Sequence, residues 1–135
     1  IHGRLTKSQR IAINNKDYDA PPLLKIYYNE GKIEVAYKVL KDKSFTGDQL
    51  LVKSNWTDAE HYYFSTSVGN EPFDLKIAAT SGNLEVSLNG TTKEFTDPDL
   101  RAWPFENYFK AGNYLTTKNE SAYSEVKFFT LNTEH

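Results

Sequence analysis

The segment Tyr108–Tyr114 carries the residues whose types and spacing could do chemistry, in the order Tyr-Phe-Lys-Ala-Gly-Asn-Tyr. Because side chains alternate between the faces of a β-strand, a strand here would place every second residue on one face: Tyr108, Lys110, Gly112 and Tyr114. A phenol and an ammonium would then lie close together, and the glycine between them would let a sugar ring approach the backbone. Patterning alone favours another interpretation, a Tyr-rich outer strand whose lysine extends into solvent.

Histidine supplies the second set of candidates. His2 lies in the alternating segment Ile1–Leu5, where a strand would put it on the same face as Arg4. His61 is interpreted as structural or solvent-exposed, and His135 as a tail residue. Three histidines without a paired spacing, in a chain without cysteine, predict no metal site. No phosphate loop or dinucleotide fingerprint is present either, so we expect no cofactor.

Carboxylates and tryptophans offer weaker candidates. Glu34, Glu85 and Glu125 fall on predicted strands and could in principle form a glycosidase pair. Charges on the outer face of a half-buried sheet are the preferred interpretation. Trp56 and Trp103 could stack on sugar rings, although Trp103 is better explained as a loop anchor packed on the core.

The elements that must position these residues are β-strands. Apolar residues recur with a period of two, and no stretch shows a sustained helical stripe, so we expect an antiparallel all-β fold. Two hairpins are predicted, one over residues 23–39 with a turn at 29–31 and one over 73–88 with a turn at 81–83. Further strands are predicted at Glu60–Val68, Asn107–Tyr114 and Ala122–Leu131, and loops at 19–22, 41–49 and 96–99.

Length and composition set the remaining limits. A chain of 135 residues fits one domain, and no run approaches the roughly 20 apolar residues that cross a bilayer. A formal net charge of −2 and scattered basic residues argue against nucleic acid, so an anionic ligand would need a local basic patch. Three sequons, at Asn55, Asn89 and Asn119, would be glycosylated only on a secretory route, and we expect a secreted protein.

The segment Tyr-Phe-Lys-Ala-Gly-Asn-Tyr resembles the C-terminal signature of polysaccharide lyase family seven, the alginate lyases. Ile1-His2-Gly3 resembles the end of that family's Gln-(Ile/Val)-His motif, and the hairpins at 21–39 and 73–89 are similar to its middle strands in order and spacing. The resemblance implies a β-jelly roll, a concanavalin-like sandwich, with a long cleft for the polymer. It also implies that residues 1–135 form the C-terminal portion of a single catalytic domain.

The resemblance assigns roles to the candidate residues. It implies endo-acting β-elimination on alginate, with Tyr114 as general acid and base and His2 assisting carboxylate neutralisation or proton abstraction. Lys110 matches a cleft residue of the family and Tyr108 belongs to the same motif, so both are expected to bind substrate, as is Arg4 from its place beside His2. A carbohydrate-binding module or lectin on the same sandwich, and a lyase for another polyuronate such as glucuronan, remain open as alternatives.

A companion segment is also expected. The family's Arg-Thr-Glu-Leu-Arg motif is missing from the chain, and Leu115-Thr116 stands where the family commonly has a polar pair. Ile1–Leu5 alternates like a strand already under way, and a jelly roll without its first strands would expose unpaired edges. We therefore expect the N-terminal strands of the domain on a separate segment, and an anionic polysaccharide as the other partner.

Overall fold

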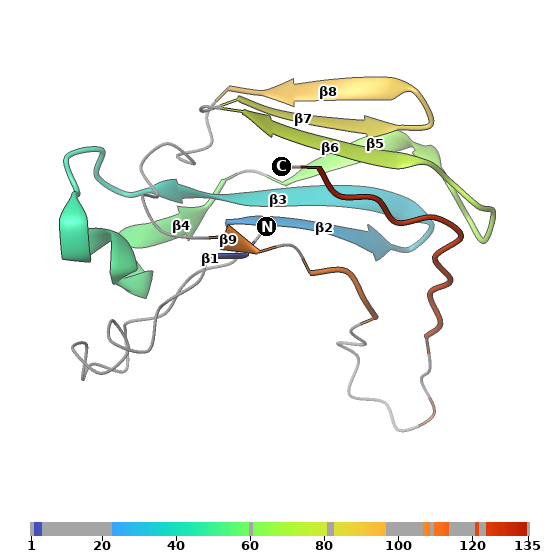
Figure 1. Ribbon diagram of the computed structural model, residues 1–135, viewed down its shortest axis with the longest axis horizontal. Helices are drawn as coiled ribbons and strands as arrows, with labels where there is room; N and C mark the ends of the chain where they lie inside the picture. Colours follow the sequence, from blue (N-terminus) through green and yellow to red (C-terminus); the bar gives the residue numbers. More distant parts are fainter. Residues whose placement is uncertain are drawn as a thin grey trace.

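The computed structural model is built from short antiparallel strands (Figure 1). It describes residues 23–59, 61–80, 83–96, 110–113, 121 and 124–134, and the backbone of 2–3 and 107–108. The strands are β1 His2–Gly3, β2 Leu24–Asn29, β3 Lys32–Leu40, β4 Trp56–Asp58, β5 Tyr62–Ser67, β6 Leu75–Thr80, β7 Asn83–Leu88, β8 Thr91–Phe95 and β9 Asn107–Tyr108. Two 3₁₀ helices, η1 Gly47–Leu51 and η2 Lys53–Asn55, complete the described elements. The expected antiparallel all-β fold is confirmed.

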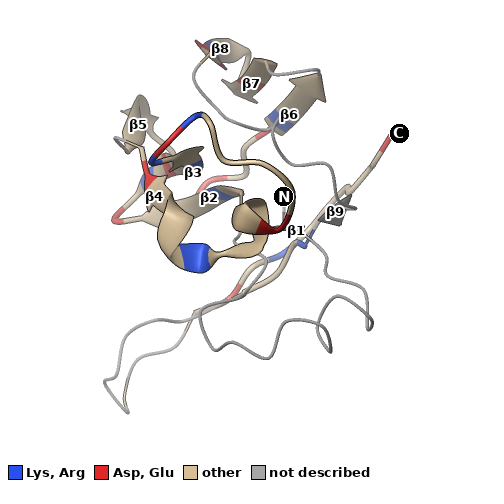
Figure 2. Cartoon of the chain, turned by 90° about the vertical axis from the view of Figure 1, so that its left-hand side faces the viewer, with Lys and Arg blue, Asp and Glu red and all other residues tan. Residues whose placement is uncertain are grey.

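The strands form three antiparallel sheets within the described residues. β1 pairs with β9, β6–β7–β8 form a meander, and β3 is the centre of a sheet with β2, β4 and β5. Figures 1 and 2 both place the β1–β9 pair beyond β2, on the side away from β3. The order β5, β3, β2 thus leads towards the short pair that carries His2 and Tyr108.

The first hairpin follows its sequence prediction closely. β2 and β3 are joined by Glu30 and Gly31, both with positive φ, 48° and 83°, as a two-residue hairpin turn requires. This turn fixes the register, so that Tyr27 pairs with Glu34 and Asn29 with Lys32. The hairpin therefore lays a polar row of residues across the face of the sheet that carries Glu34.

The second hairpin extends beyond its prediction. β6 and β7 pair as expected, and a turn at Asn89-Gly90, with φ of 48° and 83°, adds β8 as a third strand. The sequence analysis ended the hairpin at this turn. β8 reads Thr-Thr-Lys-Glu-Phe and buries only Phe95, so it has the composition of an edge strand and lacks a clear apolar alternation.

The core lies between the β2–β3–β5 sheet and the β6–β7–β8 meander. Leu84, Val86 and Leu88 of β7 are buried against residues of the other sheet, among them Val35 and Tyr37 of β3. The Tyr37 and Phe95 rings meet edge to face across the two layers, with centroids 5.4 Å apart. Two sheets that share one apolar layer in this way agree with the expected sandwich.

Two predicted strands are wrong in extent. β9 ends at Tyr108 instead of reaching Tyr114, and residues 110–113 have no regular secondary structure. The predicted strand Ala122–Leu131 is likewise absent over 124–131. Alternation indicates an extended chain, but a strand also needs a hydrogen-bonded neighbour, and the described part of the chain gives neither segment one. The predicted strand Glu60–Val68 is confirmed as β5.

A smaller apolar cluster lies under the 3₁₀ helices. Leu50 and Leu51 are buried, and Trp56 is buried beside them, with its Nε1 donating to the Leu50 carbonyl at 2.8 Å. The suggestion that Trp56 stacks on a sugar is therefore wrong, because its ring is inside the protein. Trp103 lies outside the described residues. None of the helices described is long and apolar enough to cross a membrane.

Candidate active site

The short β1–β9 ladder brings together two segments that are far apart in the sequence. His2 is the register partner of Tyr108, and Gly3 the partner of Asn107. The histidine and the Tyr-Phe-Lys segment, chosen separately from the sequence, therefore lie on neighbouring strands. This pairing is the part of the predicted site that the structure brings together.

The rest of the Tyr-Phe-Lys segment continues from β9 as an exposed chain. Lys110, Ala111, Gly112 and Asn113 are all exposed. Asn113 is tied to Ser124 by two hydrogen bonds of 2.6 Å, since its Nδ2 donates to the Ser124 carbonyl and its Oδ1 accepts from the Ser124 hydroxyl. The side chain of Asn113 is thereby committed to the protein. Arg4 and Tyr114 lie outside the described residues, so their roles stay predictions.

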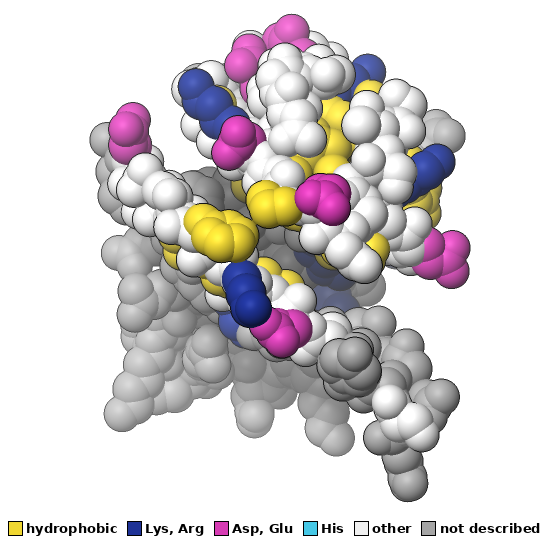
Figure 3. Space-filling model, turned by 90° about the vertical axis from the view of Figure 1, so that its right-hand side faces the viewer, with side chains coloured by type: hydrophobic (Ala, Val, Ile, Leu, Met, Phe, Trp, Pro, Cys, Tyr) yellow, Lys and Arg dark blue, Asp and Glu magenta, His cyan; other side chains and the backbone are white. Residues whose placement is uncertain are grey.

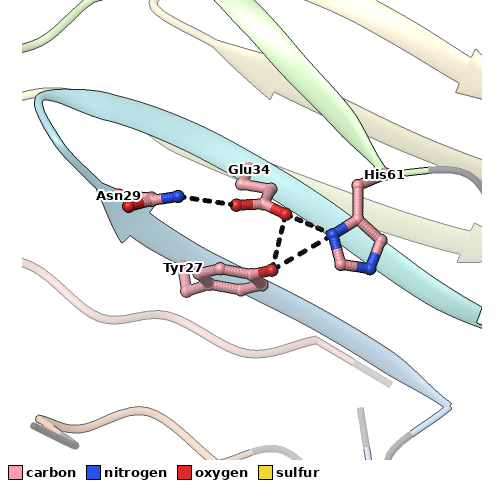
Figure 4. Close-up of polar contacts among 4 residues, drawn as sticks. All are labelled: Tyr27, Asn29, Glu34 and His61. Carbon is pink, nitrogen blue, oxygen red and sulfur yellow. Dashed lines mark hydrogen bonds and ion pairs between the residues drawn. The ribbon is translucent and has the colours of Figure 1, made fainter. Parts of the chain in front are cut away.

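A second polar cluster was missed by the sequence analysis. Glu34 was interpreted as a surface charge, and this is wrong, because it is 1% exposed. Its carboxylate accepts from the Tyr27 hydroxyl at 2.6 Å and from Asn29 Nδ2 at 3.2 Å, and it contacts His61 Nδ1 (Figure 4). Tyr63, its register partner on β5, is also hydrogen-bonded to it. We call these five residues the Glu34 cluster.

The electrostatics of the Glu34 cluster follow from its one buried charge. Burial by itself raises the pKa of Glu34, but hydrogen bonds from Tyr27, Asn29, His61 and Tyr63 outweigh it, and the pKa lies below its usual range. The same carboxylate raises the pKa values of the two phenols. The pKa of Tyr27 is raised by burial and by Glu34, and that of Tyr63 is raised by its hydrogen bond to Glu34. Glu34 is therefore an anion and both tyrosines are neutral donors.

Part of this cluster could have been found from the sequence. A two-residue turn at 30–31 pairs Tyr27 with Glu34 by counting alone, so the hairpin prediction already implied their contact. His61 could not be found in this way, because it is 27 residues from Glu34 in the chain and reaches it only through the pairing of β5 with β3. Its interpretation as structural or solvent-exposed is confirmed, since its side chain is 39% exposed and contacts Glu34.

The other candidate carboxylates agree with the surface interpretation. Glu85 is exposed on β7, and Glu125 is exposed and forms an ion pair of 3.2 Å with Lys127. They do not meet Glu34 as a pair of catalytic acids. No group of three or more potential metal ligands occurs among the residues that the structure describes.

Two of the three sequons lie in the described chain. Asn89 is exposed in the β7–β8 turn, where its Oδ1 accepts from the Asp74 amide at 2.9 Å. Asn55 is partly buried at the end of η2, and its Nδ2, the atom that a glycan would modify, donates to the Gln49 carbonyl at 2.9 Å. Asn119 lies outside the described residues. The geometry thus leaves the amide nitrogen of Asn89 more open than that of Asn55.

Fold and site together define an antiparallel β-sandwich with polar residues gathered on paired strands, an architecture that hosts carbohydrate-binding and carbohydrate-cleaving proteins alike. The family model described as alginate lyase matches residues 1–135, the whole chain. The chain therefore belongs to the alginate lyase family. No curated protein matches it.

Proposed function

We propose that the protein cleaves alginate by endo-acting β-elimination. A neutralised C6 carboxylate makes the C5 proton of the uronate removable, and a base takes this proton. The electron pair left on C5 forms the C4–C5 double bond and expels the O4 leaving group, which an acid protonates. Three kinds of residue are sufficient for these steps: one that neutralises the C6 carboxylate, one that takes the C5 proton and one that donates a proton to O4.

The pairing of β1 with β9 is the observation that carries the proposal. It sets His2 in register with Tyr108, so that two motifs shared with the family lie on adjacent strands. In the proposal Tyr114 acts as general acid and, for mannuronate, also as base. His2 assists neutralisation of the carboxylate or abstracts the proton of guluronate.

Cations complete the proposed machinery. A phenol has a reference pKa of about 10, so Tyr114 can act as a base near neutrality only where neighbouring positive charges favour its phenolate. Lys110, which is exposed four residues earlier, and Arg4 are the proposed sources of that charge. Together with Tyr108 they also hold the polyanion.

Replacement of Tyr114 by Phe tests the assignment. The ring is kept and only the proton-transfer oxygen is lost, so turnover should fall by roughly a hundredfold or more with binding nearly unchanged. Tyr28→Phe is the matched control, since this exposed tyrosine lies on β2 and faces away from Glu34. A Tyr114→Phe protein that keeps more than about a tenth of the wild-type rate would contradict the assignment.

Substrate class is tested by incubating the protein with poly-mannuronate, poly-guluronate and glucuronan while the absorbance of the unsaturated product is followed. Activity on either alginate block and none on glucuronan is the expected result. Binding without product on all three polymers would show a carbohydrate-binding module instead. Activity on glucuronan alone would show a lyase for another polyuronate.

We also propose that a companion segment completes the domain and carries the family's arginine motif. Apolar side chains that reach the surface support this (Figure 3). They lie on and just before β6 and along the C-terminal segment: Phe73, Leu75, Ile77, Val126, Phe128, Phe129 and Leu131. Intact-mass measurement on the denatured protein tests it, because a second polypeptide would appear beside the 15.5 kDa chain.

We propose further that the protein is secreted and glycosylated at Asn89, because this residue belongs to a sequon and is exposed.

A further inference from the structure

The Glu34 cluster is more elaborate than the pairing of three strands requires. Its five members come from β2, β3, β5 and the residue before β5, and all four outer members contact one carboxylate. Taking a carboxylate out of water costs several kcal/mol, and in proteins that cost is offset only by hydrogen bonds or opposite charge. Apolar residues would join the same strands without that cost. Strand pairing alone therefore does not explain the buried carboxylate, and a role in binding would.

The outer members of the cluster present chemistry to solvent. Tyr27 is 37% exposed and Tyr63 48% exposed, on strands that flank β3 on either side. The His61 ring directs Nδ1 at Glu34 and its other nitrogen away from it (Figure 4). A carboxylate on one nitrogen fixes the orientation of an imidazole and leaves the second nitrogen for a ligand. Glu34 thus positions an imidazole beside the Tyr27 hydroxyl, whose oxygen lies 3.4 Å from His61 Nδ1.

Positive charge is available on the same face. Lys25 is exposed two residues before Tyr27 on β2 and so shares its face. The nearby carboxylate of Asp58 is engaged by Lys38 at 2.8 Å, and Lys25 and His61 also act on it electrostatically. Glu34 has other partners besides His61, and Asp58 has its close partner in Lys38, so Lys25 and the second ring nitrogen of His61 can face an anionic ligand.

The cluster is unsuited to a second elimination site. Both phenols donate to Glu34 and have raised pKa values, so neither can take a proton near neutrality. Aromatic rings beside fixed donors and cations instead match an acidic sugar, whose ring can pack on tyrosine while its carboxylate accepts hydrogen bonds. Tyr27, Glu34 and Tyr63 form a row across β2, β3 and β5. The β1–β9 pair lies beyond β2, at the Tyr27 end of this row (Figures 1 and 2).

We propose that Lys25, Tyr27, His61 and Tyr63 form a subsite that binds one uronate residue of the polymer away from the bond that is cut, with Glu34 as the positioning residue. This inference rests on the proposed function for the identity of its ligand. A polymer held at this subsite as well as at the β1–β9 pair would be bound by two contacts on one molecule, which favours long chains over short ones.

Binding is tested directly on the wild-type protein by nuclear magnetic resonance. The ring signals of His61, Tyr27 and Tyr63 are followed during titration with a uronate trisaccharide, a neutral trisaccharide and inorganic sulfate. Shifts of these three residues with the uronate alone are expected. No shift with the uronate, or equal shifts with the neutral sugar or with sulfate, would overturn the inference. This readout does not depend on turnover, so it separates failure of the subsite from failure of the lyase function.

Kinetics supply the second arm. Loss of one hydrogen bond to a charged group corresponds to roughly tenfold in affinity, so Lys25→Ala and His61→Gln should each raise KM for long alginate about tenfold with kcat unchanged. The KM for a short oligomer should change less. Tyr28→Phe, on the other face of β2, should leave both constants unchanged. A fall in kcat with KM unchanged, or no change in either constant, would overturn the subsite. Melting temperatures of the variants show whether each remains folded.

Discussion

Tyr27→Phe is the most informative single change, because it removes one hydrogen bond from a buried charge and little else. The Tyr27 hydroxyl donates to Glu34 at 2.6 Å, and its ring is partly exposed and stays in place as phenylalanine. Glu34 keeps Asn29, His61 and Tyr63 as partners in the variant. The measured loss of stability therefore reports on the contact between one phenol and one carboxylate.

The magnitude follows from the type of contact. Hydrogen bonds to charged groups contribute about 1.5–3 kcal/mol, and the lower end applies here because water can reach the ring edge. We expect a loss of about 1.5 kcal/mol in the free energy of unfolding, or a melting temperature lower by about 5 °C for a domain of this size. Tyr28→Phe, on the same strand and 52% exposed, should change stability by less than about 0.5 kcal/mol.

The effect should depend on pH with a definite sign. The pKa of Glu34 is lowered in the folded protein, so its contribution to stability is present above its unfolded value of about 4.3. That contribution disappears as the pH falls through the folded pKa. Tyr27→Phe should therefore cost most near neutral pH and progressively less in acid, where Glu34 is protonated in both proteins.

Urea denaturation of wild type, Tyr27→Phe and Tyr28→Phe at neutral and acidic pH measures these differences. Equal stability of the two variants at neutral pH would refute the view that Glu34 depends on Tyr27. A Tyr27→Phe penalty that is the same in acid would show that the hydroxyl acts without the charge. Either result would also remove the argument that Glu34 is held as an anion.

Three further predictions rest on other parts of the chain. Gly31→Ala should lower the free energy of unfolding by about 1 kcal/mol more than Gly90→Ala does. Both glycines have φ of 83°, but only at Gly31 would an added Cβ meet another side chain, the Ser67 hydroxyl at 3.0 Å. Equal melting temperatures of the two variants would contradict this. Lys110→Ala should raise KM for alginate and flatten its dependence on salt, and an unchanged salt profile would remove the lysine from binding. Leu84→Ala, at a fully buried position, should lower the free energy of unfolding by about 2–5 kcal/mol in the same urea titrations, and a loss below about 1 kcal/mol would contradict its place in the core.

The local parts of the fold could be predicted because their determinants are local. Both predicted hairpins follow from apolar alternation between turn residues, and the turn residues of the first, Glu30 and Gly31, adopt positive φ. β8 was missed because an edge strand of threonine, lysine and glutamate carries no apolar period. The segments after Tyr108 and after Ala122 were assigned as strands because alternation cannot tell whether a partner strand is present.

The site was predictable to the extent that its residues are adjacent in the sequence. The Tyr-Phe-Lys segment and His2 stood out by type, and their register became clear only from the pairing of β1 with β9. Burial of Glu34 was invisible for a different reason. Its neighbours Lys32 and Lys38 mark the strand as polar on that face, whereas tyrosines from two other strands cover the carboxylate.

The β1–β9 pair has a consequence for how activity should appear and disappear. The hairpins of the sandwich close over two-residue turns, whereas His2 meets Tyr108 only after a loop of about 100 residues is closed, at an entropic cost of about 4 kcal/mol. Within the part of the chain that the structure describes, two residues of each strand join in this ladder. Its opening is therefore expected to precede loss of the sheets, as the least stable units of a fold open first. On gentle heating the protein should lose lyase activity at a temperature where its circular dichroism spectrum is still that of a folded β protein. Activity would then report the opening of the β1–β9 pair before the spectrum reports unfolding of the sheets.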